Sequence, residues 1–147
     1  FGKLGRRVGV ADRTLVYYFG DKPSLIEAVL GVLAGRLLER LDAAFGPDPR
    51  PADELLTAAY PHLIGPEADR IFALWFELAG QAAVGREPHR GLAHTMLTAW
   101  LDWLAGRIDA GPERRPTEAA MLLARLDGAL LLHHLGHSEA ALRSVGG

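Results

Sequence analysis

Apolar residues recur at every third or fourth position along most of this chain, which is the spacing of amphipathic helices. The clearest stripe comprises Ile26, Leu30, Leu33, Leu37, Leu41 and Phe45. Glycine and proline interrupt the pattern and delimit predicted helices over about 3–8, 13–19, 23–45, 52–64, 67–85, 88–110, 117–135 and 138–145. No stretch shows the alternation of apolar and polar residues that is typical of a strand, so the pattern predicts an all-α fold.

The longest interruption of the helical pattern is Gly46-Pro-Asp-Pro-Arg-Pro51, which contains three prolines. Because proline cannot continue a helix, this segment predicts a loop or hinge. We expect a head over 1–45 that ends in a long helix, and a helical body over 46–147. The 88–110 and 117–135 segments are apolar over most of their circumference, so each must be covered by the core or by a second subunit.

Composition supports the helical prediction and excludes several kinds of chemistry. Leu and Ala, which favour helices, supply 48 of the 147 residues, whereas Val, Ile and Thr together supply 16. The absence of cysteine excludes disulfides, thiolate metal sites and cysteine nucleophiles. Neither a long apolar run nor a secretion signal is present, so we expect a cytoplasmic protein without a membrane partner.

The net charge of −2 is unevenly distributed. Residues 1–40 hold seven basic and four acidic residues, a net charge of +3, and the remainder of the chain carries −5. A basic head on an acidic body is the pattern expected when only the N-terminal part contacts a polyanion. Taken alone, a charge of +3 is better explained by ordinary variation in the solvated surface.

The most specific local pattern runs from Leu4 to Ile26 and predicts two short helices joined at Gly9, followed by the long helix. This is the spacing of a helix-turn-helix motif. The second short helix, 13–19, is capped by Asp12 and directs Leu15 and Phe19 towards a core. Its other side chains, which include an arginine and two tyrosines, suit contacts with phosphates and base edges.

These residues resemble the signature of the tetracycline-repressor (TetR) family of transcriptional regulators. The resemblance covers about residues 4–30 and rests on Gly9-Val10, Thr14-Leu15, Phe19, Lys22 and Leu25. It implies that 13–19 is a recognition helix in the major groove and that Lys22 meets a phosphate. The body would then bind a small effector and pair with a second subunit.

The chain departs from the family signature at three positions, where Ala11, Val16 and Pro23 replace the usual Ser, Tyr and Glu. Tyr17 and Tyr18 are candidates to replace the phosphate contact of the missing tyrosine. The family's first helix, which packs across the motif, does not precede it here. We expect that helix to belong to a longer chain, although loss of DNA binding would give the same pattern.

Candidate DNA contacts are the basic and aromatic residues of the head: Lys3, Arg6, Arg7, Arg13, Thr14, Tyr17, Tyr18 and Lys22. Candidate ligand contacts are polar and aromatic residues of the body: Tyr60, His62, Phe72, Trp75, Phe76, Gln81, Met96, Trp100, Trp103 and His133. An apolar cavity with a few polar groups is the usual design of a ligand site. The alternatives are solvated surface for the first set and plain core packing for the second.

Asp127-Gly128 interrupts an otherwise apolar helix, and burial of an unpaired carboxylate there would be costly. We expect Asp127 to face solvent or an arginine, such as Arg125 or Arg143 of a second subunit. Gly128 permits close approach of another helix, and a similar Asp-Gly in TetR-like regulators lies in the pairing helix. The predicted dimer interface comprises Met121, Leu122, Arg125, Gly128, Leu132 and Leu142.

The remaining candidate chemistry is a His-His-x-x-His cluster formed by His133, His134 and His137. Histidines four apart on a helix can hold a metal ion, but Gly136 is expected to end the helix between them. No nucleophile elbow, phosphate-binding glycine loop or dinucleotide fingerprint is present, so we expect neither an enzyme nor a cofactor or metal.

The sequence therefore predicts a TetR-like repressor that binds palindromic operator DNA as a homodimer and is released by a small, largely apolar effector. One alternative is an all-α small-molecule-binding or scaffold protein without DNA binding. A metal-dependent enzyme built on the histidine cluster is a further alternative.

Overall fold

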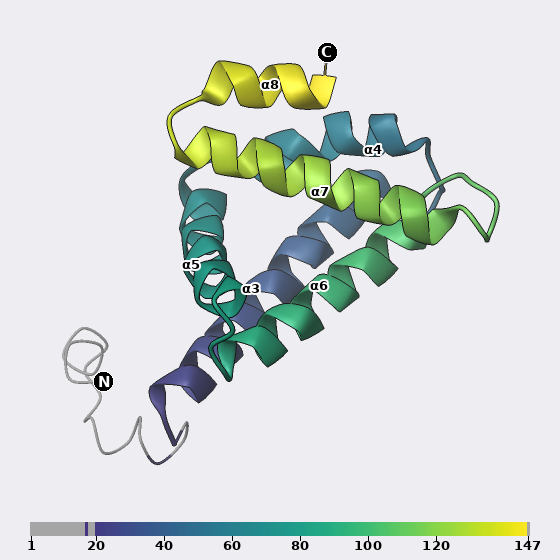
Figure 1. The fold of residues 1–147 in the computed structure, drawn as a ribbon. Coiled ribbons are helices and arrows are strands. Elements are labelled where there is room, and N and C mark those ends of the chain that lie inside the picture. The colour runs from purple at the N-terminus through teal and green to yellow at the C-terminus, as the bar shows by residue number, and fades with distance from the viewer. Residues whose placement is uncertain (1–16, 18–19, 147) are drawn as a thin grey trace.

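The computed structural model describes Tyr17 and residues 20–146, and Figure 1 shows them as helices joined by loops. In chain order the elements are α3 (Lys22–Phe45), α4 (Ala52–Ala59), the 3-10 helix η1 (Tyr60–His62), α5 (Pro66–Ala83), α6 (His89–Ala105), α7 (Arg115–His134) and α8 (Ser138–Gly146). This described part contains no strand, which confirms the all-α prediction for it. The helices predicted over 3–8 and 13–19 lie outside the described residues, apart from Tyr17, which is helical.

The ends of α3 follow from local chemistry. The backbone N–H of Ser24 donates a hydrogen bond of 2.8 Å to Oδ1 of Asp21, which also lowers the pKa of that carboxyl. The helix stops at Gly46, whose φ of 67° is a left-handed conformation that suits glycine. The predicted helix over 23–45 is thereby confirmed, with Asp21 as its cap.

The helices pack around two clusters of buried residues, and Trp75 packs against both. α3 packs against α5 and α6, the helices α5, α6 and α7 pack against one another, and α4 and α8 both pack on α7. Figure 1 shows α5, α6 and α7 as the sides of a triangle, with α3 passing behind it and α8 lying along the outer side of α7. The long helix that follows the predicted DNA-reading motif is therefore part of the same packed unit as the body.

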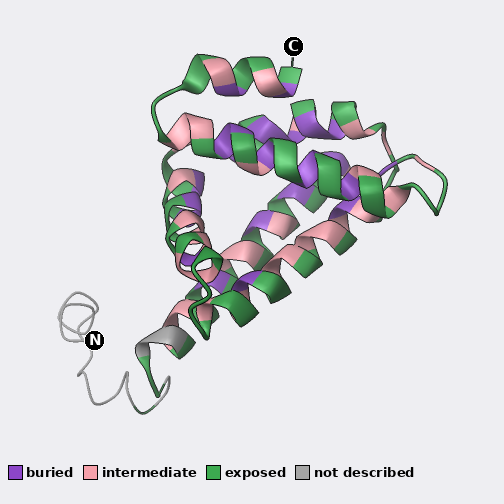
Figure 2. Cartoon of the chain, viewed as in Figure 1, coloured by how far each residue is buried: buried purple, intermediate pink, exposed green. Residues whose placement is uncertain are grey.

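A buried core connects the helices, and every helix contributes residues to it (Figure 2). In the apolar stripe of α3, Leu30, Leu37, Leu41 and Phe45 are buried, while Ile26 and the remaining leucine are half-buried. The helical period read from the sequence thus identified the inward face of α3 correctly. No helix in the described ranges combines the length and the apolar character that a membrane span requires.

Two predicted helices end earlier than expected. The 52–64 segment is α-helical only to Ala59 and continues as η1, because Pro61 cannot donate the next helical hydrogen bond. α6 ends at Ala105 rather than near 110, since the chain turns away to meet the proline-rich loop. There the N–H of Arg50 donates to the carbonyl of Arg107, and the N–H of Asp109 donates back to the carbonyl of Arg50, each at 2.8 Å.

Candidate functional site

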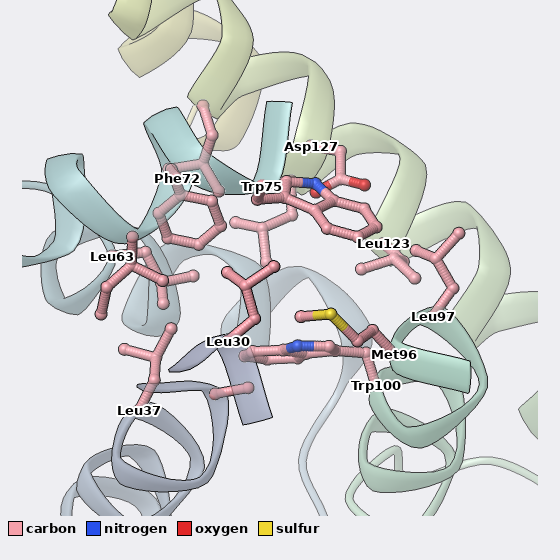
Figure 3. Close-up of a pocket in the computed structure, with 14 residues that line it drawn as sticks. Leu30, Leu37, Leu63, Phe72, Trp75, Met96, Leu97, Trp100, Leu123 and Asp127 are labelled. Carbon is pink, nitrogen blue, oxygen red and sulfur yellow. The ribbon is translucent and has the colours of Figure 1, made fainter. Parts of the chain in front are cut away.

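A narrow cavity, with about 530 Å³ of empty space when its open mouth is included, lies between α3, α5, α6 and α7 (Figure 3). Its lining residues are Leu30, Ala34, Leu37, Leu63, Ile71, Phe72, Trp75, Met96, Leu97, Trp100, Leu123, Leu126, Asp127 and Leu130. Much of this space is open to solvent, and the lining is almost wholly apolar, which is the usual character of a small-molecule site.

Side chains that line the cavity from one helix recur three or four residues apart. α7 contributes Leu123, Asp127 and Leu130, which are separated by four and three residues and so share one face. Trp75 enters from α5 and Trp100 from α6, so aromatic rings line the cavity from two helices. The site is therefore a product of packing between helices that are distant in the sequence.

Asp127 is the one ionisable residue among the cavity-lining residues. It is half-buried, and burial raises the pKa of its carboxyl from 3.8 to about 6. In Figure 3 its carboxyl lies on the same side of the cavity as the Trp75 indole. Asp127 was predicted to face solvent or a second subunit. In the structure it instead lines the cavity, on the face that it shares with the buried Leu123 and Leu130.

The predicted ligand contacts divide into two groups. Phe72, Trp75, Met96 and Trp100 line the cavity, whereas Tyr60, His62, Phe76, Gln81, Trp103 and His133 do not. Tyr60 is buried in the core among α4 and its neighbours, and the exposed His62 packs edge-on against Phe45. Phe76 lies against the His134 ring instead, with centroids 5.4 Å apart. Aromatic residues at helical spacing thus serve the core as well as the cavity.

Trp103 has a structural role at the ends of α3 and α6. Its indole Nε1 donates a hydrogen bond of 2.8 Å to Oδ1 of Asp42, and the same oxygen accepts from the Arg107 guanidinium. The guanidinium lies over the Trp103 ring, 4.1 Å from its centroid. This arrangement joins the C-terminal ends of α3 and α6.

The histidine cluster connects α7 to α5. His133 Nε2 lies 3.3 Å from Oδ1 of Asp69, and the two ring nitrogens of His134 lie 2.9 and 3.1 Å from the carbonyls of Leu130 and Asp69. Across residues 20–146 and Tyr17, no group of three or more His, Asp or Glu residues is arranged to hold a metal ion. In this structure the first two histidines therefore make contacts between helices.

The outward face of α7 and its C-cap residue form an exposed stripe of small and apolar residues, here called the α7 stripe: Met121, Ala124, Gly128, Leu131 and the C-cap Leu135. Figure 2 shows exposed bands that recur along α7 between buried ones. The stripe has the alternating spacing of three and four residues that is typical of a helix–helix seam. At Gly128 an added Cβ would meet no described atom within 4 Å, so packing within the chain does not require glycine there.

The predicted interface residues fall on more than one face of α7 and α8. Met121, Gly128 and Leu142 are exposed, in line with an interface role. Leu122 is instead buried in the chain's own core and Leu132 packs against it, while Arg125 binds Asp53 and the carbonyl of Ser144. Ala124, Leu131 and Leu135 are exposed beside Met121 and Gly128, and they were not among the predicted interface residues.

The predicted DNA contacts lie mostly outside the described residues, where Lys3, Arg6, Arg7, Arg13, Thr14 and Tyr18 all fall. Tyr17 is described, and its side chain is 83% exposed. Lys22 is the first residue of α3. The DNA-contact assignments stay predictions.

The fold and site together define an all-helical chain with an apolar cavity and one carboxylate inside it. Comparisons of the chain with protein-family models, with curated proteins and with solved structures give no match. The resemblance of residues 4–30 to the TetR family therefore also stays a prediction.

Proposed function

We propose that this chain is a ligand-responsive transcriptional repressor of the TetR type, which binds palindromic operator DNA as a homodimer. The observation that carries the proposal is the course of α3. This helix begins at Lys22, directly after the predicted recognition helix, and its residues Leu30, Ala34 and Leu37 form one wall of the cavity. A single helix therefore runs from the predicted recognition helix to the predicted ligand site.

This connection gives the proposed regulation a physical basis. Leu30 stands eight residues after the start of α3, or about 12 Å along a helix that rises 1.5 Å per residue. A ligand that fills the narrow cavity pushes against this wall and favours a different tilt of α3. The tilt changes the separation of two heads in a dimer, and the population shifts away from the state that matches the operator.

The α7 stripe supports the homodimer. Its residues Met121, Leu131 and Leu135 are 63%, 43% and 67% exposed, although apolar side chains at this spacing gain free energy from burial. A two-fold pairing places the same stripe of a second copy against them, with the two Gly128 positions allowing close approach. Leu142 of α8 is also exposed and would extend the contact.

The proposal is tested with the full chain and a library of random-sequence DNA duplexes. We expect selection to enrich palindromic duplexes whose half-sites lie one helical turn or more apart, bound with an affinity that falls steeply with salt. The double variant Arg13→Ala, Tyr17→Ala should lose this binding. Arg90→Ala, which removes an exposed arginine from α6, is the matched control and should retain it.

The proposal is contradicted if no duplex is enriched at low salt. It is also contradicted if the double variant and the control bind DNA with equal affinity. If the same protein still binds small apolar molecules in its cavity, the alternative of an all-α ligand-binding or scaffold protein without DNA binding is favoured.

A further inference from the structure

The cavity combines an apolar wall with one carboxylate that nothing in the described chain neutralises. No residue among Tyr17 and 20–146 forms an ion pair or a hydrogen bond with the Asp127 side chain. The two arginines that the sequence suggested as partners bind elsewhere: Arg125 binds Asp53, and Arg143 of α8 lies 3.7 Å from Glu139. A half-buried carboxylate in such a place is expected to have a counter-charge when the site is filled.

The aromatic lining also favours a positive charge. Trp75 and Trp100 line the cavity from different helices, and both carry ring faces of the kind that attract cations. The raised pKa of Asp127 has burial as its cause, and a cation bound beside the carboxylate would oppose it. Two independent features, the unpaired carboxylate and the indole rings, thus select for the same ligand charge.

We propose that the ligand of this cavity is a lipophilic amine, whose apolar body lies among Leu30, Met96 and Trp100 and whose ammonium group binds the Asp127 carboxylate. This inference rests on the proposed function in taking the cavity as the effector site. It excludes anionic ligands, because a second negative charge beside Asp127 would be repelled in an environment of low dielectric. It also disfavours neutral ligands, which leave the carboxylate without a counter-charge.

The inference is tested by isothermal titration of the full chain, without DNA, using three probes of one shape: phenylbutylamine, phenylbutanol and phenylbutyrate. We expect the amine to bind about tenfold or more tightly than the alcohol, the ratio typical of a hydrogen bond to a charged group, and the carboxylate to bind weakest. Quenching of tryptophan fluorescence should accompany binding, since two of the three tryptophans line the cavity.

Two variants identify the site. Asp127→Asn should abolish the preference for the amine over the alcohol, whereas Asp102→Asn, which changes an exposed aspartate of α6, should leave the preference intact. Equal affinity of the amine and the alcohol for the unmodified protein would overturn the inference. So would an unchanged preference in Asp127→Asn, or the absence of binding by all three probes.

A second measurement separates this inference from the proposed function. The amine is added to the complex of the protein with its enriched duplex, and release of DNA is followed by anisotropy. An amine preference that depends on Asp127 supports the inference whether or not the duplex is released. Failure of the bound amine to release the duplex would contradict ligand-responsive regulation. If no duplex is bound at all, the titration still decides the ligand class.

Discussion

Replacement of Asp127 by Asn should stabilise the unliganded protein, contrary to the usual effect of changing an inward-facing residue. The carboxylate lies in an apolar cavity, and burial raises its pKa to about 6, compared with 3.8 for an unburied aspartate. A group with a raised carboxyl pKa opposes folding when it is ionised, because the charged form is better solvated in the unfolded chain. Asn has nearly the same shape and carries no charge.

The size of the effect follows from the two pKa values. At 1.36 kcal/mol per pKa unit, the difference between 3.8 and about 6 corresponds to about 3 kcal/mol of destabilisation above pH 7. The folded chain binds the proton more tightly, so the penalty is absent well below pH 3.8 and grows as the pH rises towards 6. We expect Asp127→Asn to raise the free energy of unfolding by under ~1 kcal/mol at pH 4 and by up to ~3 kcal/mol at pH 8.

The assay is urea unfolding of the two proteins at pH 4, 6 and 8, at one protein concentration, since association also changes apparent stability. Asp102→Asn is the control, because that aspartate is exposed, and it should change the free energy of unfolding little at any of these pH values. A stability gain that is equal at pH 4 and pH 8 would refute the electrostatic reasoning. A loss of stability at pH 8 would show that the carboxylate has a stabilising partner.

Three further changes test the packing. Trp103→Phe removes the hydrogen bond to Asp42 and should lower the free energy of unfolding by about 1–2 kcal/mol in urea titrations. Gly46→Ala places a side chain at a φ of 67° and should cost about 1–2 kcal/mol, and an equal midpoint to the unmodified protein would contradict this. Leu131→Lys should convert the proposed dimer to monomers in analytical ultracentrifugation, whereas Leu74→Lys, at a similarly exposed leucine, should leave the dimer intact. If both variants are dimers, the α7 stripe is excluded as the dimer interface.

The helical fold was predictable because its determinants are local. The period of three to four residues, the cap at Asp21 and the stop at Gly46 each act within one or two turns, and the sequence displays them directly. One of the two wrongly predicted helix ends has a local cause, Pro61, and the other occurs where a distant segment changes the outcome. α6 ends early because the backbone around Arg107 bonds with Arg50, a residue of the loop far earlier in the chain.

The candidate site was predictable only in its residue types. Aromatic residues were expected in a cavity, and Trp75 and Trp100 line it, but Trp103 lies three residues from Trp100 and binds Asp42 instead. Helical spacing groups residues by face, yet it cannot say whether that face meets a void, a packed core or a polar partner. That choice depends on which helix lies opposite, a property of the tertiary arrangement.

Asp127 shows how the two levels combine. The sequence showed a charge in an apolar helix, and the prediction that Asp127 faces solvent or a second subunit was wrong, because its spacing puts it on the face of Leu123 and Leu130. Only the structure shows that this face borders a cavity, which turns an unfavourable residue into a candidate ligand contact. A carboxylate with a purely structural role should stabilise the fold, whereas one that awaits a cation should destabilise the empty protein. Asp127→Asn therefore distinguishes the two roles when a single variant gains stability at pH 8 and loses its preference for the amine.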